Sequence, residues 1–291
     1  MNDTLNDGRA GAPHLKPCLN LGTLADLPPH ATAPRHADKK ELYAALKAAG
    51  YVGLQGADPK LCAELGLLSF GGGRINKPAE ADELARKQKE AGQRCATLHV
   101  AWGIEDDAEV DALVGAILNA AAKHAFPLYI ETHRATITQD LWRTVRIAKA
   151  FPDVRFNADY SHWYTGLEMP YGGVEPKADF LAPVFERVRF MHGRIGNSGC
   201  MQVDFGDGRD RPYIDHFRLL WTRTFKGFLR HAGPGDYLPF CPELLQPSIN
   251  YARVFPGPDG KPVEEGDRWE LAKVMTQIAK ESFLEAVNSK Q

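Results

Sequence analysis

The feature that most constrains the fold is a strict alternation of strand-like and helix-like segments along nearly the whole chain. Eight short runs are apolar and rich in β-branched or aromatic residues, which is typical of buried strands. They span residues 18–21, 51–55, 67–70, 95–100, 128–131, 154–158, 188–191 and 238–241. Eight segments with helical patterns alternate with them, at residues 38–49, 58–65, 79–91, 106–123, 138–150, 177–186, 212–231 and 266–288. Such alternation predicts a parallel sheet with helical crossovers.

Eight strand–helix units in about 275 residues fit a closed (β/α)8 TIM barrel better than an open sheet. A doubly wound α/β fold is the competing architecture, but no G-x-G-x-x-G follows the first strand. Three glycines at 71–73 do follow a strand, yet no Lys-Ser/Thr pair comes after them as a phosphate loop requires. We therefore predict one barrel domain over residues 15–291. Residues 1–14 are polar and Gly-rich, which predicts a disordered N-terminal tail.

Composition narrows the class of protein. The chain has 291 residues, of which 44% are hydrophobic and 25% are charged, and a formal net charge of -2. The chain has no excess of basic residues that would favour binding to nucleic acid. No apolar run approaches the roughly 20 residues that span a bilayer. We therefore expect that the protein binds neither nucleic acid nor a membrane. The chain has five cysteines, an odd number, and no C-x-x-C motif. Both features argue against a disulfide framework. We expect a reduced, cytoplasmic protein with no signal peptide.

Acidic or imidazole side chains stand at the exits of four of the predicted strands. They are Glu131, Asp159, His192 and Glu243. In a parallel barrel the strand exits open on the face where active sites lie, so these side chains should converge. Each residue taken alone is most simply a surface carboxylate or a hydrogen-bonded histidine, but equivalent places in four units favour a site for one divalent metal ion. Three carboxylates and an imidazole suit Mn²⁺, with Co²⁺, Mg²⁺ or Zn²⁺ as alternatives.

Further polar and aromatic side chains lie close to these exits in the sequence. Arg194 and His133 each follow a predicted ligand by two residues, and alternate residues of a strand share a face. His162 follows Asp159 by three, and His99 lies at the end of the fourth strand, with Trp102 after it as a wall on which a sugar could stack. The alternative interpretation of Trp102 is packing in the core or a lid, and that of His133 is a hydrogen-bonding neighbour of the ligands.

The order of these residues resembles a known family. The pattern is Glu131, Asp159-x-x-His162, His192-x-Arg194 and Glu243. It resembles the xylose isomerase-like TIM barrel superfamily, and more closely its sugar phosphate isomerase/epimerase branch, which includes ketose 3-epimerases and inosose dehydratases. The resemblance runs from Cys18 to about residue 285. It implies that the four strand-exit residues bind the metal ion, that Glu131 and Glu243 are also the acid/base pair, and that His162 and Arg194 hold substrate hydroxyls.

The expected function is that of a divalent-metal-dependent sugar isomerase or epimerase, acting on a ketose or keto-sugar through an enediolate intermediate. A cation that polarises a carbonyl makes the neighbouring C–H acidic, and a carboxylate removes the proton. Return of the proton on the other face epimerises the substrate, and its return to the adjacent carbon isomerises it. Loss of a β-leaving group would instead give a lyase of the inosose dehydratase or 3-keto-glycoside deglycosidase type, for which His133 would suit as base. The site by itself does not choose between these outcomes.

Other interpretations and partners remain open at this stage. An apurinic endonuclease of the endonuclease IV type needs three metals, and residues 69–73 lack the histidine it would require. A non-catalytic barrel is the other alternative. Arg74 is the one loop candidate for binding phosphate, while Arg134 and Arg253 could serve an acidic substrate. Besides a small carbohydrate-like substrate we expect a homo-oligomer, and residues 195–211 form either part of the pocket or a subunit contact.

Overall fold

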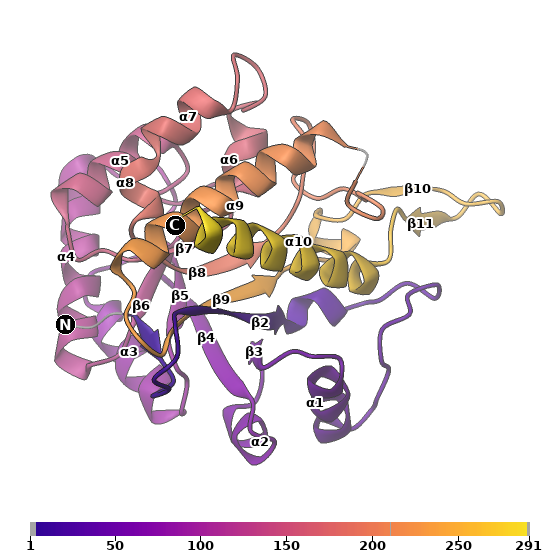
Figure 1. Ribbon diagram of the computed structural model, residues 1–291, viewed down its shortest axis with the longest axis horizontal. Coiled ribbons are helices and arrows are strands. Elements are labelled where there is room, and N and C mark those ends of the chain that lie inside the picture. Colours follow the sequence, from indigo (N-terminus) through magenta and orange to yellow (C-terminus); the bar gives the residue numbers. More distant parts are fainter. Residues whose placement is uncertain (1–3, 210, 290–291) are drawn as a thin grey trace.

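Strands β2 to β9 pair in parallel in the order of the sequence, and β9 closes the sheet against β2, as Figure 1 shows. The structure is a computed structural model that describes residues 4–209 and 211–289. The barrel strands are β2 (His14–Asn20), β3 (Gly53–Gln55), β4 (Leu68–Ile75), β5 (Ala96–Val100), β6 (Leu128–Glu131), β7 (Phe156–Ala158), β8 (Val188–Gly193) and β9 (Asp236–Pro242). The predicted (β/α)8 TIM barrel is thereby confirmed.

Most of the helices that cover the barrel begin and end close to the predicted positions; α6, α7 and α8 are the exceptions. They are α1 (Lys39–Ala48), α2 (Pro59–Glu64), α3 (Glu80–Glu90), α4 (Asp107–His124), α5 (Leu141–Ala150), α6 (Ser161–Gly166), α7 (Glu175–Phe180), α8 (Ala182–Phe185), α9 (Pro212–His231) and α10 (Arg268–Asn288). Aspartates cap many of them. In α5 the cap is Asp140, whose side chain accepts from the amide of Arg143, so this helix starts at Leu141, three residues later than predicted. Free amides at a helix start favour such a carboxylate.

Two features of the helical layer differ from the sequence prediction. The segment 177–186 forms two short helices, α7 and α8, because a proline stands in the first turn of each and cannot continue a preceding helix. Helix α6, directly after β7, was not predicted. Its six residues follow Asp159, and they bring His162 back over the end of the barrel.

The barrel interior has an apolar layer towards the N-terminal ends of the strands. One buried cluster fills it, made of Leu5, Cys18, Phe70, Cys95, Tyr129, Phe190, Tyr237 and Cys241. The aromatic rings of Phe70 and Phe190 meet edge to face at 5.2 Å. All five cysteines are free, as predicted. Three of them, Cys18, Cys95 and Cys241, lie in this layer, where their thiols serve as small apolar groups.

The N-terminal segment differs from the disordered tail predicted for residues 1–14. Residues 1–3 lie outside the described residues, but β1 (Leu5–Asn6) pairs antiparallel with β9. Leu5 is buried in the apolar layer, and Asp7 forms an ion pair with Lys16 at 2.8 Å. An apolar side chain that closes the bottom of the barrel and an ion pair with β2 explain why residues 4–14 are in place.

The loops after the later strands carry additional structure. Strands β10 (Val254–Pro256) and β11 (Pro262–Glu264) form a hairpin that projects from the barrel in Figure 1. It lies in the Pro- and Gly-rich stretch after β9. The three glycines at 71–73 lie within β4, so Arg74 belongs to a strand and is not in a loop as predicted.

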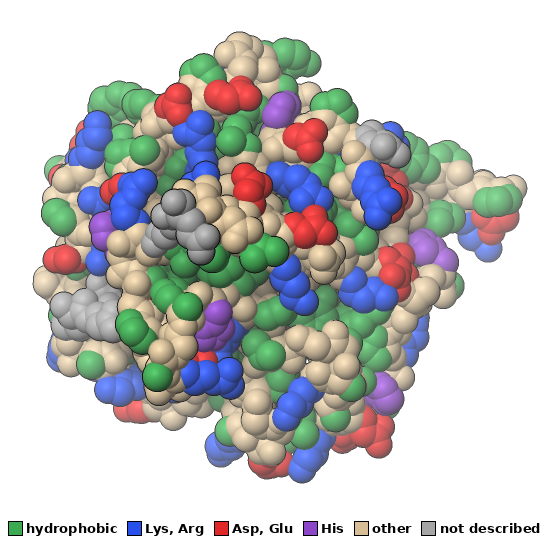
Figure 2. All heavy atoms as spheres, viewed as in Figure 1, with side chains coloured by type: hydrophobic (Ala, Val, Ile, Leu, Met, Phe, Trp, Pro, Cys, Tyr) green, Lys and Arg blue, Asp and Glu red, His purple; other side chains and the backbone are tan. Residues whose placement is uncertain are grey.

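The outer surface carries charges of both signs. In Figure 2 acidic and basic side chains are interspersed over the visible face, which agrees with the small net charge. Among the described residues, no helix is both long and apolar enough to cross a membrane.

Candidate functional site

The four side chains at the strand exits converge at the C-terminal end of the barrel. Glu131 ends β6, Asp159 directly follows β7, His192 lies in β8 and Glu243 directly follows β9. One donor atom from each lies within 4.8 Å of the donor atoms of the others. His192 Nδ1 is 3.3 Å from Glu131 Oε1 and 3.5 Å from Glu243 Oε2. The barrel therefore brings together the four residues that we predict as metal ligands.

Hydrogen bonds orient His192 within this cluster. Its Nε2 lies 2.7 Å from Gln55 Oε1, and Gln55 in turn donates to Thr97 Oγ1 at 2.9 Å. Once His192 loses a proton to bind an ion, a proton on Nε2 held by Gln55 would leave the Nδ1 lone pair directed towards the carboxylates. This is the arrangement in which a histidine ligand is usually fixed in metal sites, because the distal nitrogen sets the tautomer.

The electrostatics of the cluster are those of buried, compensated charges. Burial would raise the pKa of Glu131, but His192 and His99 outweigh it and hold that pKa well below its usual range. Burial would likewise lower the pKa of His192, yet Glu243 and Glu131 raise it to about 9. Burial works against Asp159 too, and Arg194 leads the contacts that lower its pKa. Glu131 and Asp159 are thus ionised, and in the metal-free protein His192 and Arg194 supply the positive charge that compensates them.

The donor set fits a divalent cation. Three carboxylates and one imidazole are ligands that Mn²⁺ and related ions accept. Glu131 Oε1 is buried and makes no regular hydrogen bond, only ion-pair contacts with His192 Nδ1 at 3.3 Å and His99 Nε2 at 3.4 Å. This is unusual for a charged oxygen and is expected of an atom that faces a bound cation. The role of these residues as ligands stays a prediction.

Arg194 lies fully buried between two of the carboxylates. Its Nε donates to Asp159 Oδ2 at 3.1 Å, and its Nη2 donates to Glu243. The ring of Tyr251 lies 4.4 Å from its guanidinium carbon. Arg194 therefore contacts two of the predicted ligands but is not among the residues that line the cavity beside them. Its contact with substrate hydroxyls stays a prediction.

Three imidazoles form a row of mutually tilted rings beside the cluster. The ring centroids of His99 and His133 are 4.1 Å apart, and those of His133 and His162 are 3.8 Å apart. Burial, assisted by His99, lowers the pKa of His133 to about 4, and burial holds the pKa of His162 well below its usual range. His133 and His162 are therefore neutral. His99, Glu131 and His133 also bring three donor atoms within 4.8 Å of one another.

The remaining predicted residues lie around the rim. Trp102 follows β5 and is 55% exposed, with the guanidinium carbon of Arg74 at 4.1 Å from its ring. Arg253 donates to both carboxylate oxygens of Glu265, so its charge is already paired and the expectation that it serves an acidic substrate is not supported. Arg134 is exposed. A cavity of roughly 370 Å³ opens beside the cluster, lined by Asn20, Gln55, Gly56, Gly72, Gly73, Thr97, His99, Glu131, His192 and Glu243.

Several neutral polar residues of the site were missed at the sequence level. Asn20 donates to Glu243 Oε1 at 2.7 Å, and Asn157 donates to Glu131 Oε2 at 3.0 Å. Both, like Gln55, end or nearly end a barrel strand, so extending the strand-exit rule from charged residues to amides would have found them. Tyr251 comes from the loop after β9, and no local pattern marks it.

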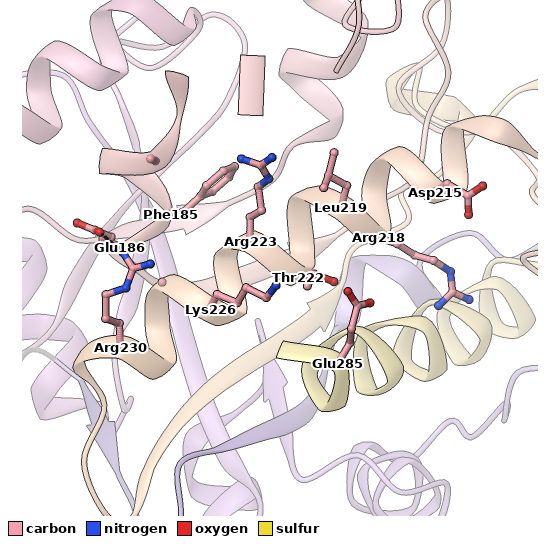
Figure 3. A pocket seen from close by; sticks show the side chains of 12 residues that line it. Phe185, Glu186, Asp215, Arg218, Leu219, Thr222, Arg223, Lys226, Arg230 and Glu285 are labelled. Carbon is pink, nitrogen blue, oxygen red and sulfur yellow. Dashed lines mark hydrogen bonds and ion pairs between the residues drawn. The ribbon is translucent and has the colours of Figure 1, made fainter. Parts of the chain in front are cut away.

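A larger hollow lies elsewhere, on the outside of the barrel between α8, α9 and α10 (Figure 3). Basic side chains along α9 point into it, but three of them pair with acids: Arg218 with Glu281, Arg223 with Asp179 and Arg230 with Glu186. The described residues that line it form no group of converging donor atoms comparable to that of Glu131, Asp159, His192 and Glu243. Its size alone does not make it the site of chemistry.

Comparison with known proteins agrees with the fold. No family model and no curated protein matches the chain. Among solved structures, a xylose isomerase-like TIM barrel protein from Mycobacterium smegmatis, in complex with magnesium, is 14% identical with a TM-score of 0.54; the match covers 92% of this chain and 97% of that one. A xylose isomerase domain protein from Planctomyces limnophilus is 14% identical with a TM-score of 0.50, over 94% of this chain and 98% of that one. The predicted resemblance is confirmed at the level of the fold.

Proposed function

We propose that this barrel, which shares the fold of the xylose isomerase-like TIM barrel proteins, is a divalent-metal-dependent sugar isomerase or epimerase acting on a ketose or keto-sugar through an enediolate. The observation that carries the proposal is the convergence of Glu131, Asp159, His192 and Glu243 from four strands onto one point. Active sites of TIM barrels lie at this end. The expected partner is a small carbohydrate-like substrate, in a cytoplasmic and homo-oligomeric protein.

Mn²⁺ is the ion that we propose for the cluster, with Mg²⁺, Co²⁺ and Zn²⁺ as alternatives. Magnesium is supported by the M. smegmatis protein of the same fold, which was crystallised with that ion. When bound, the ion would act as a Lewis acid on the substrate carbonyl and acidify the neighbouring C–H. Glu131, Asp159, His192 and Glu243 would hold it.

The surroundings of the two glutamates support a role for them in moving the proton. Glu131 has a strongly lowered pKa, and Asn157 fixes its Oε2, so it is an ionised carboxylate of defined orientation. Glu243 is held by Asn20 and Arg194. Because they come from strands β6 and β9, on either side of β7 and β8, one can remove a proton and the other return it to the opposite face.

His162 is suited to bind the substrate. Both of its ring nitrogens are buried and make no regular hydrogen bond, although Nε2 lies 3.5 Å from Asp159 Oδ2. A buried polar nitrogen without a hydrogen bond is costly, and a substrate hydroxyl would supply one to Nδ1. Arg194 and Trp102 would complete the binding of the sugar.

A lyase is the second candidate, and His133 is the observation that favours it. Its Nδ1 lies 2.5 Å from the backbone oxygen of Arg134, and its Nε2 is 3.3 Å from the hydroxyl of Tyr251. A neutral imidazole with one nitrogen directed towards a phenol can act as a base for elimination from a keto-sugar. Dehydration or cleavage of a 3-keto-glycoside would then replace epimerisation.

A proton-exchange screen in D₂O tests the proposal. Metal-loaded protein is incubated with ketoses, inososes and 3-keto-glycosides, and the position of deuterium names the acidic carbon. Deuterium retained in an epimer or isomer supports the first candidate, and release of a β-leaving group supports the lyase. Exchange into none of these classes would contradict both and favour the non-catalytic barrel.

Metal content separates the proposal from the endonuclease-like alternative. We expect one ion per chain in the wild-type protein and none in Asp159→Asn, measured by elemental analysis after dialysis. Three ions per chain would favour the nuclease instead.

A further inference from the structure

Arg74 is a cation near the metal cluster, and no described carboxylate forms an ion pair with it. It lies in β4, half-buried. Its Nη1 donates to the backbone oxygen of Ala101 at 2.5 Å, and its Nη2 lies 3.4 Å from His99 Nδ1. A guanidinium has five N–H donors, and these contacts leave others free. The buried Arg194 and the rim residue Arg253 are instead already paired with carboxylates.

The loop after β5 holds Arg74 in place without neutralising it. Trp102 lies under its guanidinium at 4.1 Å. Ala101, whose oxygen accepts from Arg74, has a φ of 53°, a left-handed conformation that disfavours a residue with a Cβ and often marks functional positions. Glu105, the carboxylate of this loop, accepts from the amides of Trp102 and Gly103 instead.

Arg74 also faces the same interior as the metal cluster. Gly72 lines the cavity, and Arg74 lies two residues further along β4, where side chains share a face. A Cβ on Gly72 would meet nothing closer than 3.5 Å, so the missing side chain leaves space beside the cluster. One imidazole, His99, separates Arg74 from Glu131, with Nε2 at 3.4 Å from Glu131 Oε1.

We propose that Arg74, supported by Trp102 and His99, forms an anion subsite for a carboxylate or phosphate group at the end of the substrate remote from its reacting carbons. This rests on the proposed function for the identity of the ligand as a substrate, although anion binding itself does not. A planar guanidinium binds both groups through two parallel hydrogen bonds. Stacking on Trp102 fixes the plane beforehand, which reduces the ordering cost of binding.

Small anions test the subsite directly. Metal-free protein is titrated with inorganic phosphate and with acetate by calorimetry and tryptophan fluorescence, for the wild type, Arg74→Gln and Arg187→Gln. Arg187 is the matched control, because it is also half-buried and donates to a backbone oxygen, that of Pro183, but lies at the opposite end of the barrel. We expect binding in the wild type and the control, and affinity roughly tenfold or more weaker in Arg74→Gln, as for loss of a charged hydrogen-bond donor.

Each other outcome overturns the proposal. No binding to the wild type, equal affinity in Arg74→Gln, or a loss in Arg134→Gln without one in Arg74→Gln would place the anion elsewhere or nowhere. Thermal unfolding is measured in parallel. If Arg74→Gln does not fold, Arg74→Lys serves in its place, since it keeps a cation but loses the planar pair of donors. It should bind both anions more weakly than the wild type, and unchanged affinity would contradict the subsite.

Matched sugars distinguish the source of the charge. D-fructose, D-fructuronate and D-fructose 6-phosphate share the ketone end and differ at the far end, and their C–H exchange in D₂O is measured with metal-loaded protein. The charged compound that the subsite accepts should show a raised KM in Arg74→Gln, while the neutral sugar is unchanged. If none exchanges, that result counts against the proposed function for these sugars, while the phosphate and acetate titrations still decide the subsite.

Discussion

The two ends of the barrel interior are built from the same strands but have opposite chemical character. On β8, Phe190 lies in the apolar layer and His192, two residues later, lies in the polar cluster. Tyr129 and Glu131 repeat this relation on β6. Since alternate residues of a strand share a face, each of these two strands supplies one side chain to the apolar layer and, two residues later, one to the polar cluster. A residue that stabilises the barrel and a residue of the proposed active site can therefore lie only two positions apart on one strand.

The largest expected effect comes from substitutions at the polar end of the barrel interior. Glu131→Gln and Glu243→Gln should each lower turnover by about 10²–10⁴-fold, because a positioned acid or base contributes this much, and should leave the protein folded. Initial rates of C–H exchange in D₂O and thermal unfolding measure the two effects. Glu90→Gln, on the exposed face of α3, is the control and should keep its rate. Unchanged turnover in both active-site variants would refute the acid/base assignment.

The next prediction concerns a substitution in the apolar layer at the other end of the barrel interior. Phe190→Ala should lower the free energy of unfolding by about 3–5 kcal/mol, because it leaves a cavity where the ring now packs against Phe70. Urea denaturation measures it. Phe255→Ala, on the exposed hairpin, should change stability by less than about 0.5 kcal/mol. A comparable loss in both variants would mean that the apolar layer does not hold the barrel.

Substitutions at Gln55 test whether a neutral residue beside the polar cluster contributes to metal binding. Gln55→Ala removes the acceptor for His192 Nε2 and should weaken metal binding by about 10–100-fold, as other losses of a ligand's orienting partner do. Gln55→Glu keeps an acceptor and should retain more affinity. Metal titration by calorimetry compares both with Gln277→Ala on α10, where no change is expected. Equal affinity in all variants would show that His192 needs no orientation.

The next prediction concerns the dependence of metal binding on pH. In the metal-free protein, with its pKa raised to about 9, His192 is protonated at neutral pH and must lose a proton to bind the ion. Metal affinity should therefore rise by about tenfold per pH unit below pH 9, with one proton released per ion. Titrations in buffers of different ionisation enthalpy measure the release. No release near pH 7 would contradict the raised pKa or the role of His192 as a ligand.

The same shift affects stability in the absence of metal. A histidine whose pKa rises on folding stabilises the folded state at a pH below its unfolded value, near 6.5, and this contribution is lost as the pH rises through about 9. His192→Asn should remove this pH dependence. Unfolding of the metal-free protein at pH 6 and pH 9.5 checks the sign.

Much of the site could be predicted because its residues follow one local rule. Glu131, Asp159 and Glu243 end or directly follow apolar strands, and parallel strands in a barrel bring their ends together. Asn157 and Gln55 follow the same rule, but they are neutral amides and the prediction considered only acidic and imidazole side chains at strand exits. Arg74 was assigned to a loop because glycines usually break strands, whereas here they lie within β4.

The sequence by itself determined the eight-unit barrel and the strand exits that carry acidic and imidazole groups. These follow from the periodicity of apolar residues and from strand alternation, which are local properties. Only the tertiary structure decided which polar atoms meet: that Gln55 orients His192, that Arg194 bridges Asp159 and Glu243, and that Arg253 is already paired. Such contacts join residues far apart in the chain, and their energies depend on burial and distance, which no local pattern contains.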